Sequence, residues 1–111
     1  MFKYMLVPLT GSKTGVIPLE HRDKVSIGRM SPIDIIREMV TDDFYVSRHH
    51  CDVEVYGEKV FVRDFLSTNG TFIEGEKILS GGRRELKVGQ ILSLGSGSPI
   101  KGAAAFILTR V

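Results

Sequence analysis

Hydroxyl and guanidinium side chains recur together at separate places in this sequence. Arg29 stands near the end of an apolar run, and Ser47 is followed directly by Arg48. Further along, Thr68 is followed by Asn69. Arginine can give forked, charge-assisted hydrogen bonds to a phosphate, hydroxyls can donate to phosphate oxygens, and an asparagine amide can hold the main chain of an extended peptide. Two arginines also match the roughly −1.5 to −2 charge of a protein phosphate, so the residue types favour a phosphate site.

Each of these residues also has a simpler explanation. A lone Arg29 is more often a solvated surface arginine, and Gly28 permits close approach of another backbone. Asn69-Gly70 between two apolar runs is by itself a signal for a hairpin turn. His50 begins an alternating segment and is expected to be a hydrogen-bonded structural histidine. Only the combination of the clusters therefore indicates binding.

The sequence gives little support for a catalytic site or a metal site. Ser47, His50 and Asp64 have the types of a hydrolase triad, but the serine is not in a G-x-S-x-G turn. His49, His50 and Cys51 are adjacent, and neighbours along a strand point to opposite faces, so they cannot converge on one ion. We therefore expect no catalytic residue, no metal and no cofactor.

The elements that must position these clusters are short strands. Cys51, Val53 and Val55 alternate with polar residues, which is the pattern of a half-buried strand, and Gly57-Glu58 then makes a tight hairpin. Each polar cluster stands at the end of a strand candidate and so belongs to a loop. Ten or so short strands at this spacing predict a β-sandwich or barrel. The other strand candidates are residues 2–7, 16–19, 25–27, 59–63, 71–73, 77–79, 91–94 and 103–108.

The stretch 30–46 is the exception to this regular pattern. Ser31, Pro32 and Asp34 fit the start of a helix, and apolar residues then recur at helical spacing. A short helix or a long loop fits this stretch as well as a strand around 34–36 does.

Composition describes an ordinary globular chain. It has 111 residues, 42% hydrophobic residues and a formal net charge of +2. We expect one domain over 1–111, and the mild charge does not favour direct nucleic-acid binding. The lone Cys51 excludes an internal disulfide and favours a reducing compartment, and no apolar run reaches the ~20 residues of a membrane span. We expect a cytoplasmic or nuclear protein.

The clusters in this order resemble the forkhead-associated (FHA) domain family. The resemblance runs from Lys24 to Leu108 and, by length, includes the first two strands. It implies an all-β, SMAD/FHA-like sandwich of about eleven mostly antiparallel strands, with binding loops at one end. The motifs that carry it are Gly28-Arg29, Ser47-Arg48-x-His50, Asp64-x-x-Ser67-Thr68-Asn69-Gly70-Thr71-Phe72, Gly75-x-x-Ile78, Leu86-x-x-Gly89-Gln90 and Ile91-x-x-Leu94-Gly95.

The resemblance also implies a role for each residue of the site. Arg29 would contact the phosphate or the peptide backbone. Ser47 would bond a phosphate oxygen, and Arg48 would add a second phosphate contact. Thr68 would reach the phosphate and shape the pocket for the threonine γ-methyl, and Asn69 would hold the peptide main chain. The residues that would form the frame of the site are Gly28, His50 and Gly70.

The function implied is a non-catalytic module that recognises phosphothreonine in a partner protein, itself the product of a Ser/Thr kinase, and so mediates phosphorylation-dependent interaction in signalling. The alternative is a structural or self-association sandwich that binds no phosphate. The stretch 30–46 is a few residues longer than the loop and strand usual in the family. Tyr45 lies near where the family reads the residue after the phosphothreonine, which makes it a candidate selectivity contact.

Overall fold

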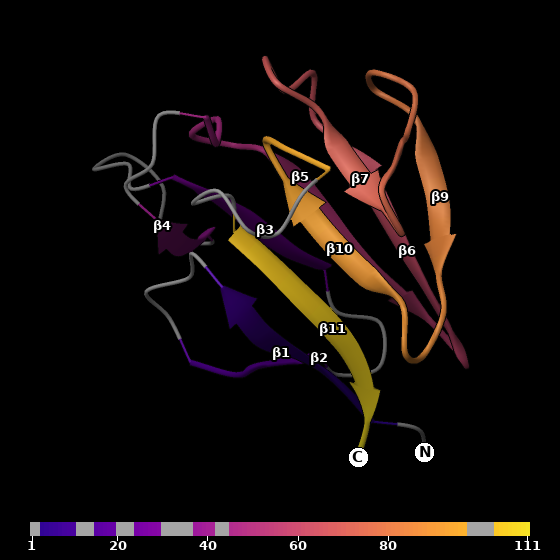
Figure 1. Cartoon of the computed structure of the whole chain (residues 1–111). Coiled ribbons are helices and arrows are strands. Elements are labelled where there is room, and N and C mark those ends of the chain that lie inside the picture. Colours follow the sequence, from indigo (N-terminus) through magenta and orange to yellow (C-terminus); the bar gives the residue numbers. More distant parts are fainter. Residues whose placement is uncertain (1–2, 11–14, 20–23, 30–36, 42–44, 98–103) are drawn as a thin grey trace.

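The protein consists of short β-strands in two layers, in a computed structural model that describes residues 3–10, 15–19, 24–29, 37–41, 45–97 and 104–111 (Figure 1). For residues 37–41 the description covers the backbone only. Within the described residues, no helix is long and apolar enough to cross a membrane.

The described residues form eleven strands in two sheets. The first sheet has the order β2-β1-β11-β10-β7-β8, and the second has the order β4-β3-β5-β6-β9. All pairings are antiparallel except the parallel pair β3–β4. The fold class expected from the sequence, an all-β sandwich of mostly antiparallel strands, is therefore confirmed. The bounds are β1 Tyr4–Thr10, β2 Ile17–Leu19, β3 Lys24–Arg29, β4 Arg37–Thr41, β5 Cys51–Tyr56, β6 Lys59–Asp64, β7 Thr71–Ile73, β8 Glu76–Lys77, β9 Arg83–Leu86, β10 Ile91–Leu94 and β11 Ala104–Arg110.

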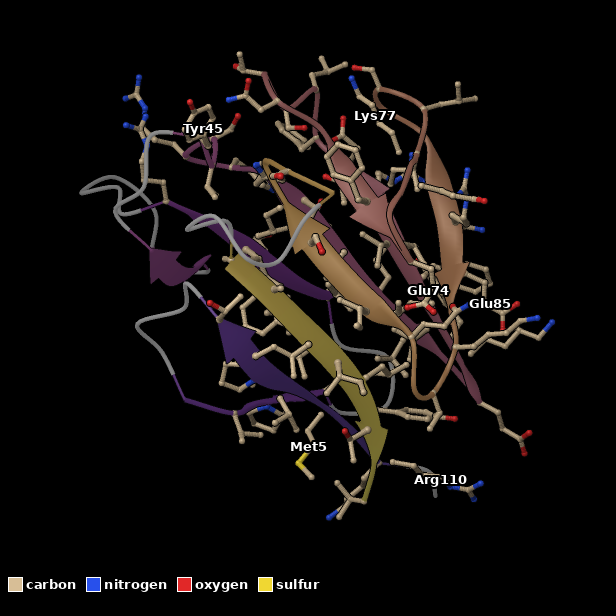
Figure 2. All side chains as sticks on the ribbon, viewed as in Figure 1. Met5, Tyr45, Glu74, Lys77, Glu85 and Arg110 are labelled. Atoms are coloured by element: carbon tan, nitrogen blue, oxygen red, sulfur yellow. The ribbon has the colours of Figure 1, made fainter. Side chains whose placement is uncertain are left out.

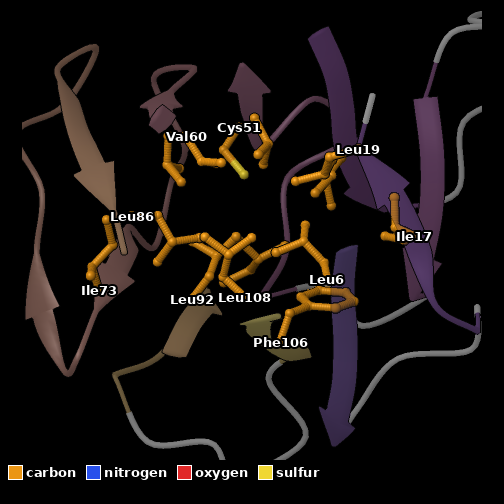
Figure 3. Close-up of a cluster of buried hydrophobic side chains, with 14 of the residues drawn as sticks. Leu6, Ile17, Leu19, Cys51, Val60, Ile73, Leu86, Leu92, Phe106 and Leu108 are labelled. Carbon is orange, nitrogen blue, oxygen red and sulfur yellow. The ribbon is translucent and has the colours of Figure 1, made fainter. Parts of the chain in front are cut away.

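The core lies between the two sheets (Figure 3). In β5 the alternate residues Cys51, Val53 and Val55 face inward with at most 1% of their surface exposed. Leu6 and Phe106 meet them from the first sheet and are fully buried. Burying a side chain of this size stabilises the fold by roughly 1.5–3 kcal/mol, so this layer is what holds the strand ends, and hence the loops, in place.

Two segments differ from the sequence-based expectation. The stretch 30–46 contains strand β4 at Arg37–Thr41, so residues 37–41 are neither helix nor loop. The strand considered around 34–36 and the suggested helix start lie outside the described residues. Strand β9 falls in a segment with no apolar alternation, because it is an edge strand whose first two residues, Arg83 and Arg84, are exposed.

Candidate functional site

The three polar clusters meet at one end of the sandwich, where the end of β3, residues 45–50 before β5 and the β6–β7 connection lie together (Figure 1). The main-chain N–H of Arg29 donates to the Ser47 carbonyl at 2.9 Å. The N–H of Thr68 donates to the Ser47 Oγ at 3.1 Å, and the Asn69 Nδ2 donates to the Tyr45 carbonyl at 3.1 Å. Ser47 is thus the central residue of the cluster, since it bonds directly to the end of β3 and to the β6–β7 loop.

Gly28 allows the β4–β5 loop to press against the end of β3. A Cβ at position 28 would lie 1.9 Å from the Arg48 carbonyl oxygen and 2.9 Å from the Ser47 carbonyl oxygen. Both are backbone atoms, which cannot move aside without moving the loop. The glycine is therefore required by close approach of a neighbouring backbone.

His50 joins the β4–β5 loop to the β6–β7 loop from inside the protein. Its ring is fully buried. The Nδ1 accepts the N–H of Ser47 at 3.0 Å, and the Nε2 lies 2.8 Å from the Gly70 carbonyl oxygen. A neutral imidazole with its proton on Nε2 satisfies both bonds at once. A positively charged ring would bring an N–H of Nδ1 against the Ser47 N–H.

The His50 link predicts that the fold loses stability in mild acid. Burial lowers the pKa of His50 below its ordinary value of 6.5, although the Gly70 carbonyl and the Asp64 charge act in the opposite direction. Since the folded-state pKa is depressed, the unfolded chain binds the proton first. The contribution of His50 is complete above pH 6.5 and declines as pH falls from there towards the folded-state pKa.

Urea unfolding between pH 7.5 and pH 5 checks this prediction. We expect the free energy of unfolding to fall with pH more steeply in the wild type than in His50→Gln, which offers a donor and an acceptor but does not titrate. Parallel curves for the two proteins would show that His50 is not the responsible group.

Asp64 fixes the β6–β7 loop. Its carboxylate, only 2% exposed, accepts bonds from the Ser67 N–H at 3.2 Å, the Ser67 hydroxyl, the Thr71 hydroxyl at 2.7 Å and the Gly81 N–H at 3.2 Å. Burial alone would raise the pKa of Asp64, but these hydrogen bonds together outweigh it and lower the pKa. Ser67 Oγ in turn accepts the Gly70 N–H at 3.1 Å. Sequence reasoning missed this role, although the Asp-x-x-Ser spacing is typical of a side-chain-stabilised turn.

Gly70 ends the loop in a conformation that favours glycine, with a φ of +96°. Its carbonyl accepts from His50 and also from the Gly95 N–H at 2.9 Å. A Cβ at position 70 would lie 2.8 Å from the Cε of Lys77, so the Lys77 stem crosses this glycine at the site end of the molecule (Figure 2). The sequence pattern placed Lys77 only in a strand and gave no signal for this position.

The side chains proposed to bind the phosphate are at the surface. Arg48 and Thr68 are exposed, and Arg29, Ser47 and Asn69 are partly buried. Because the Ser47 Oγ acts as an acceptor for the Thr68 N–H, its own proton can be donated to an anion. Arg29 at the end of β3 is thus bonded to the loop of Ser47 and Arg48, which is bonded in turn to the loop of Thr68 and Asn69.

Ser47, His50 and Asp64 are the residue types of a hydrolase triad, but they do not have the arrangement of a triad. The Nδ1 of His50 bonds the main-chain N–H of Ser47, and the Ser47 Oγ bonds Thr68. The Asp64 carboxylate bonds Ser67, Thr71 and Gly81. No serine–histidine–aspartate relay is therefore formed by these residues.

The adjacent residues His49, His50 and Cys51 also have separate surroundings. His49 stacks on Phe65 at 3.8 Å between ring centroids and contacts Asp52 at 2.6 Å. Cys51 lies in the core, where burial raises the pKa of its thiol. Among the described residues no three histidine, cysteine or acidic side chains gather in a way that could hold a metal ion.

Known proteins resemble this chain in sequence and in fold. FraH from Nostoc sp. is 40% identical over 52 residues, which are 47% of this chain and 18% of that protein. The FHA domain of CT664 from Chlamydia trachomatis has 23% identity and a TM-score of 0.75, with 96% of each chain covered. The FHA domain of an Arabidopsis thaliana hypothetical protein has 18% identity and a TM-score of 0.80, covering 100% of this chain and 87% of that one.

A third structure is the N-terminal FHA domain of Rad53p from S. cerevisiae in complex with a phosphothreonine peptide. It has 16% identity and a TM-score of 0.76, and covers 96% of this chain and 91% of that one. These structural likenesses establish the fold. The FHA domain model itself matches residues 25–95, which include β3 from Val25 onward and all three polar clusters. This chain is a member of the FHA domain family.

Proposed function

We propose that this chain binds phosphothreonine in a partner protein, the product of a Ser/Thr kinase, and acts as a non-catalytic interaction module in signalling. The observation that carries the proposal is the direct bonding of the loops around Ser47, which places hydroxyl and guanidinium groups at one end of the sandwich. The Rad53p complex with a phosphothreonine peptide, in the same fold, supports it. We propose that residues 1–111 act as one such module inside the cell.

Each of the five side chains would have a role in phosphopeptide binding that follows from its chemistry. Arg29 and Arg48 would supply the positive charge, and Ser47 and Thr68 would donate hydroxyl protons to the phosphate oxygens. Thr68 would also border the pocket for the threonine γ-methyl. Asn69 uses Nδ2 on the Tyr45 carbonyl, so its Oδ1 would accept an N–H of the bound peptide.

Selectivity beyond the phosphothreonine is proposed for Tyr45. Its side chain is 62% exposed, and its carbonyl is bonded to Asn69, which would hold the peptide. Gly95 also packs against this residue, since a Cβ there would lie 2.6 Å from the Tyr45 carbonyl oxygen. These contacts would hold the tyrosine next to the main chain of the bound peptide.

Titration with three matched peptides tests the proposal. A phosphothreonine peptide should bind, and the unphosphorylated peptide should bind at least about tenfold more weakly, because it lacks the charge-assisted bonds. The phosphoserine peptide should bind roughly fourfold more weakly, since it lacks one methyl worth about 0.8 kcal/mol. Equal binding of all three, or dimers of the protein with no phosphopeptide binding, would favour the structural alternative.

A further inference from the structure

Two leucines beside the proposed phosphate site are unusually exposed. Leu66, at the start of the β6–β7 loop, has 74% of its surface exposed, and Leu79, in the β8–β9 loop, has 81%. The two loops lie next to each other at the site end of the molecule (Figure 1). Leu66 lies over the β8–β9 loop, because a Cβ on Gly81 would be 3.3 Å from the Leu66 Cδ2. We call Leu66, Leu79 and Gly81 the leucine patch.

The backbone of Leu66 is in a conformation that the leucine side chain disfavours. Its φ is +51°, in the left-handed region where a Cβ is crowded and glycine is the usual residue. Since the side chain is mostly exposed, the fold gains little packing from it in return. A strained backbone that carries a mostly exposed apolar side chain is a reason to look for a contact outside the chain.

Asp64 holds the patch and the proposed phosphate site together. Its Oδ2 accepts the N–H of Ser67 and the N–H of Gly81, both at 3.2 Å, and so binds the β6–β7 loop to the β8–β9 loop. The Asp64 N–H also donates to the Gly82 carbonyl at 2.9 Å. Leu66 therefore keeps a fixed position close to Thr68, two residues further along the chain.

Tyr45 precedes β5, whereas the leucine patch belongs to the β6–β7 and β8–β9 loops. Figure 2 shows Tyr45 on the side of the β4–β5 connection and Lys77 on the side of the β7–β8 hairpin, near the β8–β9 loop. Asn69 contacts the Tyr45 carbonyl, whereas Leu66 contacts Gly81. A peptide bound across Thr68 and Asn69 would contact Tyr45 with the residues on one side of its phosphothreonine. It would contact the two leucines with the residues on the other side.

We infer that the leucine patch binds an apolar side chain of the phosphorylated partner, two to four residues from the phosphothreonine and on the side away from Tyr45. The inference rests on the proposed function. An extended chain advances roughly 3.3 Å per residue, so such a side chain reaches the patch while the phosphate stays on its loops. The occupant is apolar because the exposed groups of both leucines are hydrocarbon, which gains by leaving water.

Two variants and a set of peptides test the inference. The peptides carry phosphothreonine and either leucine or serine at single positions two to four residues away on each side. The wild type should prefer leucine at a position on one side only. Leu66→Gly and Leu79→Ser should lose this preference, with about tenfold weaker binding of the leucine peptide and unchanged binding of the serine peptide. Leu66→Gly should also melt at the same or a higher temperature, because glycine relieves the strain.

Val88→Ser is the matched control, since Val88 is 53% exposed in the β9–β10 turn at the far end (Figure 1). It should leave both peptides unaffected. If the wild type binds the phosphothreonine peptides but shows no preference for leucine at any position, the inference is wrong and the proposed function still stands. The inference would also be wrong if the variants weakened both peptides equally, or if they abolished a dimer of the protein instead. A wild type that binds no phosphopeptide would overturn the proposed function.

Discussion

Replacing Arg29 with Ala is expected to weaken phosphothreonine-peptide binding by roughly tenfold to more than a hundredfold, because a charge-assisted hydrogen bond is worth about 1.5–3 kcal/mol. Arg29 ends β3, and its main-chain N–H donates to the Ser47 carbonyl, which places the residue beside the loop that carries Ser47 and Arg48. Isothermal titration calorimetry gives the change directly. Arg29→Lys should retain part of the affinity, since lysine keeps the positive charge but cannot form the two parallel hydrogen bonds of a guanidinium group.

The matched control for this change is Arg110→Ala. It removes the same charge at the opposite end of the sandwich, where Figure 2 shows Arg110 near the chain terminus. We expect its affinity to stay within about twofold of the wild type, because salt screens charges separated by more than roughly 8 Å. Equal losses in Arg29→Ala and Arg110→Ala would mean that only net charge matters and that Arg29 is not a ligand. A circular dichroism melt of each variant separates loss of binding from loss of folding.

Replacing Gly28 with Ala is expected to have the largest effect on stability. The added Cβ would stand 1.9 Å from the Arg48 carbonyl oxygen, so β3 and the β4–β5 loop must separate. Overpacking against fixed atoms destabilises a protein by about 1–3 kcal/mol, and backbone contacts leave the least room to relax. Because the same shift moves Ser47 and Arg48, peptide affinity should fall as well.

Gly15→Ala serves as the control for the glycine change. A Cβ at Gly15 meets nothing within 4 Å. Urea unfolding of both variants should show a large loss at position 28 and a change within about 0.5 kcal/mol at position 15, as for an ordinary surface substitution. An unfolding free energy for Gly28→Ala equal to that of the wild type would contradict the close approach of the two backbones.

The strands were predictable where burial imposes a period of two. Cys51, Val53 and Val55 alternate with polar residues because one face of β5 packs on the core, and residues 71–73 and 91–94 were predicted with the bounds that the structure has. Strand β9 was not predicted, because an exposed edge strand has no alternation to detect. The stretch 30–46 carried conflicting helix and strand signals, and β4 within it pairs in parallel with β3, a long-range contact that no local pattern encodes.

The order of the motifs predicted the candidate site residues, but it did not predict the groups that connect them. The hairpin interpretation of Asn69-Gly70 is wrong, because β6 and β7 belong to different sheets and do not pair. A local turn signal cannot distinguish a hairpin from a crossing between sheets. Likewise, the bonds from Asp64 to Gly81 and from His50 to Gly70 join residues far apart in the chain, so they follow only from the fold.

The most direct test of the phosphate site is an NMR titration of the labelled protein with a phosphothreonine peptide and its unphosphorylated twin. With the phosphopeptide, the largest amide shifts should fall on Arg29, Ser47, Arg48, Thr68 and Asn69, while the unphosphorylated peptide leaves these signals in place. Shifts that are the same for both peptides, or that gather at the β9–β10 turn at the opposite end, would contradict a phosphothreonine site on these loops.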